Sequence, residues 1–322
     1  MARSTFISDG PDFDQFNPQL HRATRARYAT ILLRISGVMP PPRRSMLFVP
    51  ATRPDRFSKA IATGTDIVIV DWEDAVAANL KAEARKSVGT FFSDPTERSL
   101  LRYLRINSPR LEEGLRDLEA LFEMETLPDG IMIPKVESPE EVLWVSEILT
   151  PYRPNIELFP VVENARGVRA LAEIALASNA TTVIGFGAVD LVAETGSDLS
   201  WDALLYTRSQ VVLAAAEAGV ECMDTVYIDI GNEAGLKTEA KKARSVGFTG
   251  KAAIHPSQIA TINFAFSPTK DEVDFAQKVV EATTDDFSGA VQVDGKMIDE
   301  PVIIAARRTL ARAERISSAA SK

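Results

Sequence analysis

The chain contains few of the residues that build metal centres and covalent crosslinks. In 322 residues there are one cysteine, Cys222, and two histidines, His21 and His255. A single cysteine excludes an internal disulfide and favours a reducing compartment, so a cytoplasmic location is expected. Two histidines exclude a histidine-rich zinc cage, and a centre with two histidine ligands is not expected. Any metal site is therefore expected to depend on carboxylates.

Long apolar runs and an excess of basic residues are also absent. No apolar run approaches the ~18 residues of a membrane span. The 36 Lys and Arg residues are outnumbered by 45 Asp and Glu residues, which gives a net charge of −9. Such a balance argues against non-specific nucleic-acid binding, which needs clustered basic side chains. We therefore expect neither a membrane nor a nucleic acid as a partner, although a local basic site can still bind an anion.

Residues 1–42 are expected to form an N-terminal arm that ends in three prolines. Acidic residues come early in this segment, and its apolar stretch, Ile31–Leu33, is too short for a secretory signal. An organelle transit peptide is the alternative, since the segment also carries arginines. The arginines concerned are Arg22, Arg25, Arg27 and Arg34.

Residues 43–265 alternate short apolar runs with longer amphipathic ones, the pattern of a (β/α)8 TIM barrel with one helix after each strand. An open, doubly wound sheet is the alternative, but no G-x-G-x-x-G motif follows any of the runs. Among the expected helices is Pro139–Leu149, for which Ser138 is placed to act as the N-cap. The predicted strands are Met46–Val49, Asp66–Val70, Leu101–Ile106, Gly130–Ile133, Ile156–Val162, Thr181–Phe186, Met223–Ile228 and Lys251–Ile254.

Residues 266–322 are expected to form a C-terminal extension rather than another barrel unit. A helix is predicted over Glu272–Thr283, followed by a short strand at Ala290–Val293. A turn at Asp294-Gly295 and a final helix from about Pro301 to Ile316 complete the segment.

Polar side chains follow nearly every predicted strand. The C-terminal ends of barrel strands surround the active site, so these side chains are expected to converge there. Glu163 and Asp190 end adjacent strands, and such a carboxylate pair suits Mg²⁺, with Arg105 placed to bind the carboxylate of an α-keto acid. The strand-end residues are Asp71, Glu73, Asp74, Arg105, Asn107, Lys135, Glu163, Asp190 and His255.

Each of these residues also has a structural explanation. A strand-end carboxylate often caps or pairs with the next helix, and Arg105 could pair with Asp71 or Glu137. Lys135 could form a Schiff base, as in metal-free aldolases, or an internal ion pair. His255 could cap a helix rather than take part in chemistry.

Ordered sequence blocks resemble the citrate lyase β-subunit family within the HpcH/HpaI aldolase superfamily. The resemblance runs from about Arg43 to about Arg312. The matching blocks are Arg43–Pro50, Val70–Val76, Leu104–Asn107, Ile133–Ser138, Glu163–Val168, Gly187–Leu191, Gly250–Gln258 and Asp294–Asp299.

The resemblance implies a TIM-type barrel that cleaves a 3-hydroxy-3-carboxyacyl thioester into an acyl thioester and an α-keto acid. It implies that Glu163 and Asp190 bind Mg²⁺ and that Arg105 holds the keto acid. Glu73 and Asp74 would order the waters of the metal.

Further substrate contacts are implied at other blocks. Phe48 and Arg53 would lie along the coenzyme A channel, and Val189 would contact substrate. Ile254 and His255 would line the thioester side. Asp299 would reach into a neighbouring subunit's site and act on the thioester enolate or a water, in a homotrimer or homohexamer. The family pattern differs at Ala51, Trp72 and Asn164, and Trp72 and Asn164 are expected to add bulk at the barrel mouth.

Two other functions remain open from the sequence. The chain could be a citrate lyase subunit that acts on the thioester of an acyl-carrier protein. It could also be a non-catalytic relative that binds acyl-CoA or a keto acid, although Arg105, Glu163 and Asp190 are all present.

Overall fold

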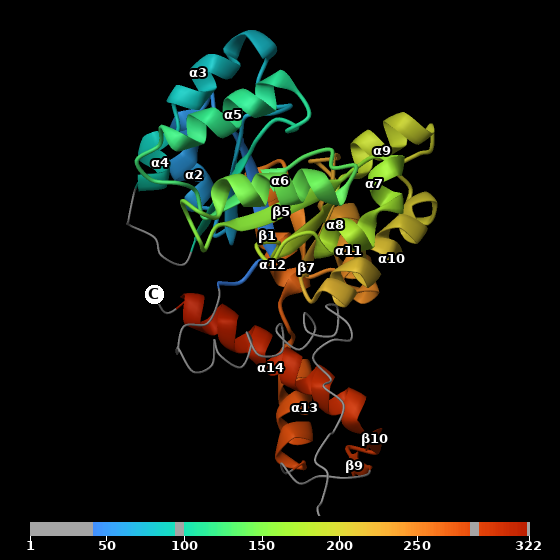
Figure 1. Ribbon diagram of the computed structural model, residues 1–322. Coiled ribbons are helices and arrows are strands. Elements are labelled where there is room, and N and C mark those ends of the chain that lie inside the picture. Colours follow the sequence, from blue (N-terminus) through green and yellow to red (C-terminus); the bar gives the residue numbers. More distant parts are fainter. Residues whose placement is uncertain (1–40, 94–99, 284–289, 321–322) are drawn as a thin grey trace, which may run out of the picture. The chain divides into compact units, whose positions relative to one another are not determined.

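The computed structural model describes residues 41–93, 100–283 and 290–320, so the predicted arm lies almost entirely outside the described residues. Eight parallel strands pair in chain order, and β1 pairs with β8 to close a barrel (Figure 1). The predicted TIM barrel is confirmed and the open sheet is wrong. The strands are β1 (Ser45–Pro50), β2 (Ile67–Asp71), β3 (Leu101–Arg105), β4 (Gly130–Ile133), β5 (Glu157–Val162), β6 (Val183–Phe186), β7 (Glu221–Asp224) and β8 (Gly250–Ala253).

Helices surround this barrel, at least one after each strand. Helices from α2 to α12, with three 3₁₀ turns, cover it. They are η2 (Pro54–Arg56), α2 (Phe57–Ile61), η3 (Ala78–Leu80), α3 (Lys81–Lys86), α4 (Gly89–Ser93), α5 (Glu112–Phe122), α6 (Pro139–Leu149), α7 (Ala165–Arg169), α8 (Leu171–Leu176), α9 (Ala188–Thr195), α10 (Trp201–Ala218), α11 (Glu233–Val246), η4 (Pro256–Gln258) and α12 (Ile259–Phe266).

The barrel strands are apolar on both faces, because one face packs inside the barrel and the other packs against the surrounding helices. In β2, Ile67 and Ile69 pack inside the barrel with residues such as Phe159. Val68 and Val70 alternate with them and pack in the larger core between strands and helices. Continuous apolar runs of this kind are typical of parallel strands.

A buried ionic cluster lies outside the inner core, where β7 and β8 meet α10 and α11. Asp224 accepts hydrogen bonds from Arg208 Nε at 2.9 Å and from Lys251 Nζ at 2.7 Å. Lys251 also contacts Glu239 at 2.7 Å and donates to the carbonyl of Thr225 at 2.7 Å. Burial alone would raise the pKa of Asp224, but Lys251 and Arg208 bring it below its usual value.

Two local expectations were wrong, and a third was confirmed in part. The seventh strand was predicted over Met223–Ile228, but β7 ends at Asp224, and Ile228 is exposed in the loop that follows. Ser138 is the N-cap residue of α6, as predicted, but its side chain makes no capping bond. Trp72 adds no bulk at the barrel mouth, because its ring is buried in the outer core and its Nε1 donates to the carbonyl of Ala84 at 3.2 Å.

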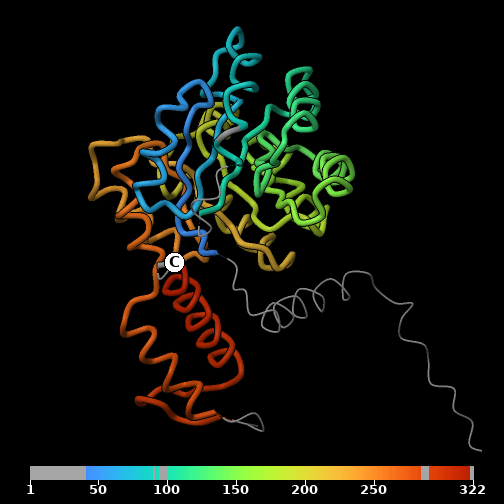
Figure 2. The backbone as a smooth tube through the Cα atoms, turned by 90° about the vertical axis from the view of Figure 1, so that its left-hand side faces the viewer, coloured from blue at the N-terminus to red at the C-terminus, as the bar shows by residue number. Residues whose placement is uncertain are grey.

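The predicted C-terminal helical extension is present. Helix α13 (Lys270–Glu281) is followed by the hairpin strands β9 (Val291–Val293) and β10 (Lys296–Ile298), and then by α14 (Glu300–Ala320). Asp294 and Gly295 join the hairpin with positive φ angles of 49° and 78°, as a tight two-residue turn requires. Helices α13 and α14 lie side by side and share an apolar cluster (Figure 2).

No helix in the described segments is both long and apolar enough to cross a lipid bilayer.

Candidate active site

A cavity of about 110 Å³ opens at the C-terminal ends of the barrel strands. Its walls combine an apolar inner part, with Phe159 and Met223, and a polar rim. Of the residues predicted for the site, the cavity is lined by Phe48, Arg105, Glu163, Val189 and Asp190. The structure therefore brings together the three residues on which the strand-end argument depended.

Arg105 is held at this cavity by two carboxylates. Asp71 and Arg105 are register partners on β2 and β3, and Asp71 accepts from Arg105 Nε at 2.8 Å and from Nη2 at 2.5 Å. Glu73 Oε2 lies 2.8 Å from Arg105 Nη1. Burial opposes the charge, but these carboxylates outweigh it and raise the pKa of Arg105, so the guanidinium is a fixed cation. Phe48 lies against it, with its ring centroid 4.7 Å from Cζ.

Asp71 also shapes the loop that carries the other acids. Its Oδ1 accepts from the N–H of Glu73 at 2.8 Å, and its Oδ2 accepts from the N–H of Ala75 at 3.1 Å. The pairing of Arg105 with Asp71, one of the two structural alternatives, is thus present. It positions the guanidinium at the cavity rather than removing it from the site.

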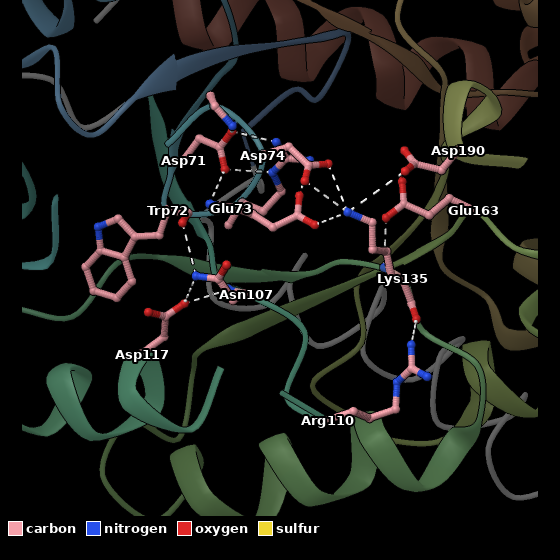
Figure 3. Close-up of polar contacts among 12 residues, drawn as sticks. Asp71, Trp72, Glu73, Asp74, Asn107, Arg110, Asp117, Lys135, Glu163 and Asp190 are labelled. Carbon is pink, nitrogen blue, oxygen red and sulfur yellow. Dashed lines mark hydrogen bonds and ion pairs between the residues drawn. The ribbon is translucent and has the colours of Figure 1, made fainter. Parts of the chain in front are cut away.

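Lys135 lies between the acidic residues (Figure 3). Its ammonium donates to Glu73 Oε1 and lies 2.9 Å from Asp74 Oδ2. Burial would lower the pKa of Lys135, but Glu73 and Asp74 raise it well above its usual value. The ion-pair alternative for Lys135 is therefore confirmed, and Schiff-base formation would first require the amine to leave both carboxylates.

Glu163 follows β5 and is buried, whereas Asp190 lies in the first turn of α9 and is 42 % exposed at its side chain. Burial, with Asp190 and Glu73 nearby, raises the pKa of Glu163 to about 8. A buried carboxylate with a second carboxylate beside it forms a place where a divalent cation would be stabilised.

The backbone around Gly187 is adapted to this carboxylate pair. A Cβ atom at Gly187 would lie 2.2 Å from Glu163 Oε2, so only glycine leaves the carboxylate in place. Within the described segments no group of three or more His, Cys, Asp or Glu side chains is arranged as a metal site. Glu163 and Asp190 line the same cavity, so they fit a cation held by two protein carboxylates, with its other positions available to water or substrate.

Changing Gly187 to Ala should displace Glu163 and weaken Mg²⁺ binding at least about tenfold, since the carboxylate that would bind the cation is moved from its place. Isothermal titration with Mg²⁺ measures this. The matched control is Gly89→Ala, where an added Cβ meets no atom within 4 Å. Equal Mg²⁺ affinity in the two variants would contradict a cation site at Glu163.

Three predicted residues follow β1 or β8 but do not line the cavity. Arg53 is exposed and pairs with Asp55 at 2.8 Å. Ile254 is 40 % exposed, and its N–H donates to Gln258. His255 acts as the cap of η4, because its Nδ1 accepts from the N–H of Ser257 at 3.3 Å. The capping alternative for His255 is therefore confirmed, and its contact with a thioester stays a prediction.

Asp299 lies at the start of α14, where its Oδ1 accepts from the N–H of Val302 at 3.4 Å. The structure gives it no hydrogen bond to the cavity residues of the described chain. Its predicted role involves a neighbouring subunit, which a single chain does not test.

Thr225 was missed by the sequence reasoning, because it stood inside an apolar run. It lines the cavity, and its hydroxyl accepts from the N–H of Ala188 at 3.0 Å, which fixes the start of the helix that carries Asp190. No motif in the sequence marked this contact.

A closed (β/α)8 barrel with a clamped arginine and a carboxylate pair in a cavity at its strand ends is the arrangement of a TIM-barrel enzyme. Comparison with known proteins narrows this class. The family model of HpcH/HpaI aldolase/citrate lyase matches residues 44–256, and the chain belongs to this family.

Similar proteins include two lyases. The human mitochondrial citramalyl-CoA lyase is 32% identical, over 92% of this chain and 98% of its own length. The citrate lyase subunit beta of Escherichia coli is 36% identical, over 84% of this chain and 93% of its own. A crystal structure of CitE from Mycobacterium tuberculosis with magnesium, acetoacetate and coenzyme A superposes with a TM-score of 0.71, at 35% identity over 85% of this chain and 98% of that one.

Proposed function

We propose that this protein is a Mg²⁺-dependent carbon–carbon lyase. Its substrate would be a 3-hydroxy-3-carboxyacyl-CoA of the malyl, citramalyl or citryl type, and its products an acyl-CoA and an α-keto acid. The observation that carries the proposal is the convergence of Glu163, Asp190 and the doubly held Arg105 on one cavity. The activities for which the related lyases are named, and the ligands of the similar crystal structure, support it.

In this proposal Arg105 binds the carboxylate of the keto-acid portion. Asp71 and Glu73 hold its guanidinium in one orientation, so little side-chain entropy is lost when the substrate binds. A planar guanidinium also fits a carboxylate in a bidentate manner. Substrate orientation is thus the main contribution of Arg105.

Glu163 and Asp190 would hold the Mg²⁺, which when bound supplies Lewis-acid stabilisation of developing oxygen charge. Glu73 and Asp74 would order the waters around it. Loss of the hydroxyl proton to a base makes the new carbonyl of the keto acid as the carbon–carbon bond breaks. The bond electrons pass to the thioester, whose enolate is then protonated to the acyl-CoA. We assign the contact with the thioester enolate, or with a water that protonates it, to Asp299 of a neighbouring subunit.

The apolar inner wall of the cavity limits water near the reacting atoms. Phe159, Met223 and Met132 line it, and Phe48 covers the arginine. An apolar wall that excludes water strengthens the electrostatic attraction between Arg105 and the substrate carboxylate. Val189 lines the same cavity and would contact the acyl group, whereas Arg53, Ile254 and His255 would contact the coenzyme A portion.

A citrate lyase subunit that acts on an acyl-carrier-protein thioester is the second candidate, and its support is the relative of that name. We also propose that the chain forms a homotrimer or homohexamer, since Asp299 is not placed at the cavity by its own chain. A cytoplasmic location belongs to the same proposal, in keeping with the single, unpaired Cys222.

The function is tested with purified protein, Mg²⁺ and malyl-, β-methylmalyl-, citramalyl- and citryl-CoA. Released keto acid is measured, with Asp190→Ala as the control that removes one cation ligand. Turnover that disappears in this variant supports the lyase and identifies its substrate. Mg²⁺ binding without turnover on any thioester favours the carrier-protein candidate, and absence of Mg²⁺ binding overturns both.

A further inference from the structure

Lys135 contacts carboxylates on both sides of the barrel mouth (Figure 3). Its ammonium bonds to Glu73 and Asp74, which follow β2, and lies 3.9 Å from Asp190 Oδ1. Its backbone N–H donates to Glu163 Oε1 at 2.8 Å. One residue thus contacts both proposed cation ligands and the neighbouring pair of acids.

The backbone of Lys135 is held in an unusual conformation. Its φ angle is +54°, in the left-handed region that residues with long side chains rarely adopt. Both of its backbone polar groups are engaged, the N–H by Glu163 and the carbonyl by Arg110 Nη2 at 2.9 Å. Non-glycine residues in this region cluster at functional sites, where surrounding contacts maintain the strain.

The ammonium of Lys135 lies where three carboxylates converge. Glu73, Asp74 and Asp190 each have an oxygen within 4 Å of it. A divalent cation at the mouth would attract the same groups. Mg²⁺ accepts about six oxygen ligands in an octahedral arrangement, so each added carboxylate would remove a position from water or substrate.

We propose that Lys135 determines the ligand set of the metal, an inference that rests on the proposed function. Its ammonium keeps Glu73 and Asp74 away from the cation and leaves Glu163 and Asp190 as the only protein ligands. Two carboxylate ligands keep enough positions open for a keto acid to bind the metal through two oxygens. Lys135 is therefore a positioning residue. It lowers the affinity for Mg²⁺ and thereby leaves coordination positions of the metal free for the substrate.

The test is titration of the full chain with Mg²⁺ alone, followed by titration of the Mg²⁺-loaded protein with pyruvate. Lys135→Met should bind Mg²⁺ about tenfold more tightly, because Glu73 and Asp74 are released to the cation. It should bind pyruvate about tenfold more weakly, because the added ligands occupy its positions. Lys135→Gly, which accommodates the left-handed backbone, should behave as Lys135→Met does and serves if the latter does not fold.

Two further variants separate charge from structure. Lys135→Arg keeps the positive charge and should bind Mg²⁺ within about threefold of the wild type. A triple variant combines Lys135→Met with Glu73→Gln and Asp74→Asn, and its control is the double variant that keeps Lys135. The triple variant should bind Mg²⁺ no more tightly than this control. A neutral amide is a weaker metal ligand than a carboxylate. Loss of the tightened Mg²⁺ binding in the triple variant would therefore assign that tightening to Glu73 and Asp74.

Unchanged or weaker Mg²⁺ binding in both Lys135→Met and Lys135→Gly overturns the inference, and so does tight binding that persists in the triple variant. Failure of the proposed function is seen separately, because the wild-type protein would then release no keto acid from any CoA thioester, whatever the Mg²⁺ affinities of the Lys135 variants.

Discussion

Replacing Arg105 with Lys is expected to lower kcat/KM for the CoA thioester by about 10²–10⁴-fold. A lysine cannot bond to Asp71, Glu73 and a substrate carboxylate together, because its charge lies on one nitrogen. Two charge-assisted hydrogen bonds, each contributing about 1.5–3 kcal/mol, correspond to that range of rates. Steady-state release of keto acid measures the effect, and a large rise in KM would place it in substrate binding.

Arg116→Lys is the matched control for this variant. Arg116 lies on α5, where it is exposed and pairs with Glu112 and Glu113. It should keep wild-type kcat/KM. An Arg105→Lys variant within about threefold of this control would show that the guanidinium does not orient the substrate.

The largest effect on stability is expected for Asp224→Ala, which should lower the free energy of unfolding by about 3–5 kcal/mol. The change removes the carboxylate that Arg208 and Lys251 share and leaves two buried cations with Glu239 as their remaining acid. Urea denaturation at pH 7 measures the loss. Glu217→Ala, an exposed acid on α10, should change stability by less than about 0.5 kcal/mol.

This effect should also depend on pH. The folded-state pKa of Asp224 lies below its usual value, so its contribution is present above about pH 4 and is lost as the pH falls through the folded-state pKa. The difference between wild type and Asp224→Ala should therefore shrink in acid. A difference below about 1 kcal/mol at pH 7 would mean that the cluster does not stabilise the fold.

The barrel could be predicted from sequence because its strands are buried on both faces. Apolar runs such as Ile67–Val70 then stand out from the amphipathic helices around them. The end of β7 could not be predicted in this way, since Val226 continues the apolar run while the chain already leaves the sheet. The strand ends at Asp224, whose buried ion pairs with Arg208 and Lys251 leave no periodic pattern in the sequence.

The candidate site could be predicted in part for a similar reason. Barrel geometry places every strand end around one mouth, so Arg105, Glu163 and Asp190 were found from position alone. The left-handed conformation of Lys135 is set by tertiary contacts with Glu163 and Arg110, and no local pattern encodes it. The predicted reach of Asp299 concerns two chains, so it is a property of an assembly rather than of the fold.

Closure of the barrel has a consequence for how the protein is made. Ser45 of β1 pairs with Lys251 of β8, a separation of 251 − 45 = 206 residues. The ribosome must therefore release nearly all of the barrel before β1 and β8 can pair. Glu163 and Asp190 emerge well before that point, but the ring that surrounds them is still open. During this interval the edges of β1 and β7 are unpaired, and they are the strands most exposed to wrong partners in a crowded cell.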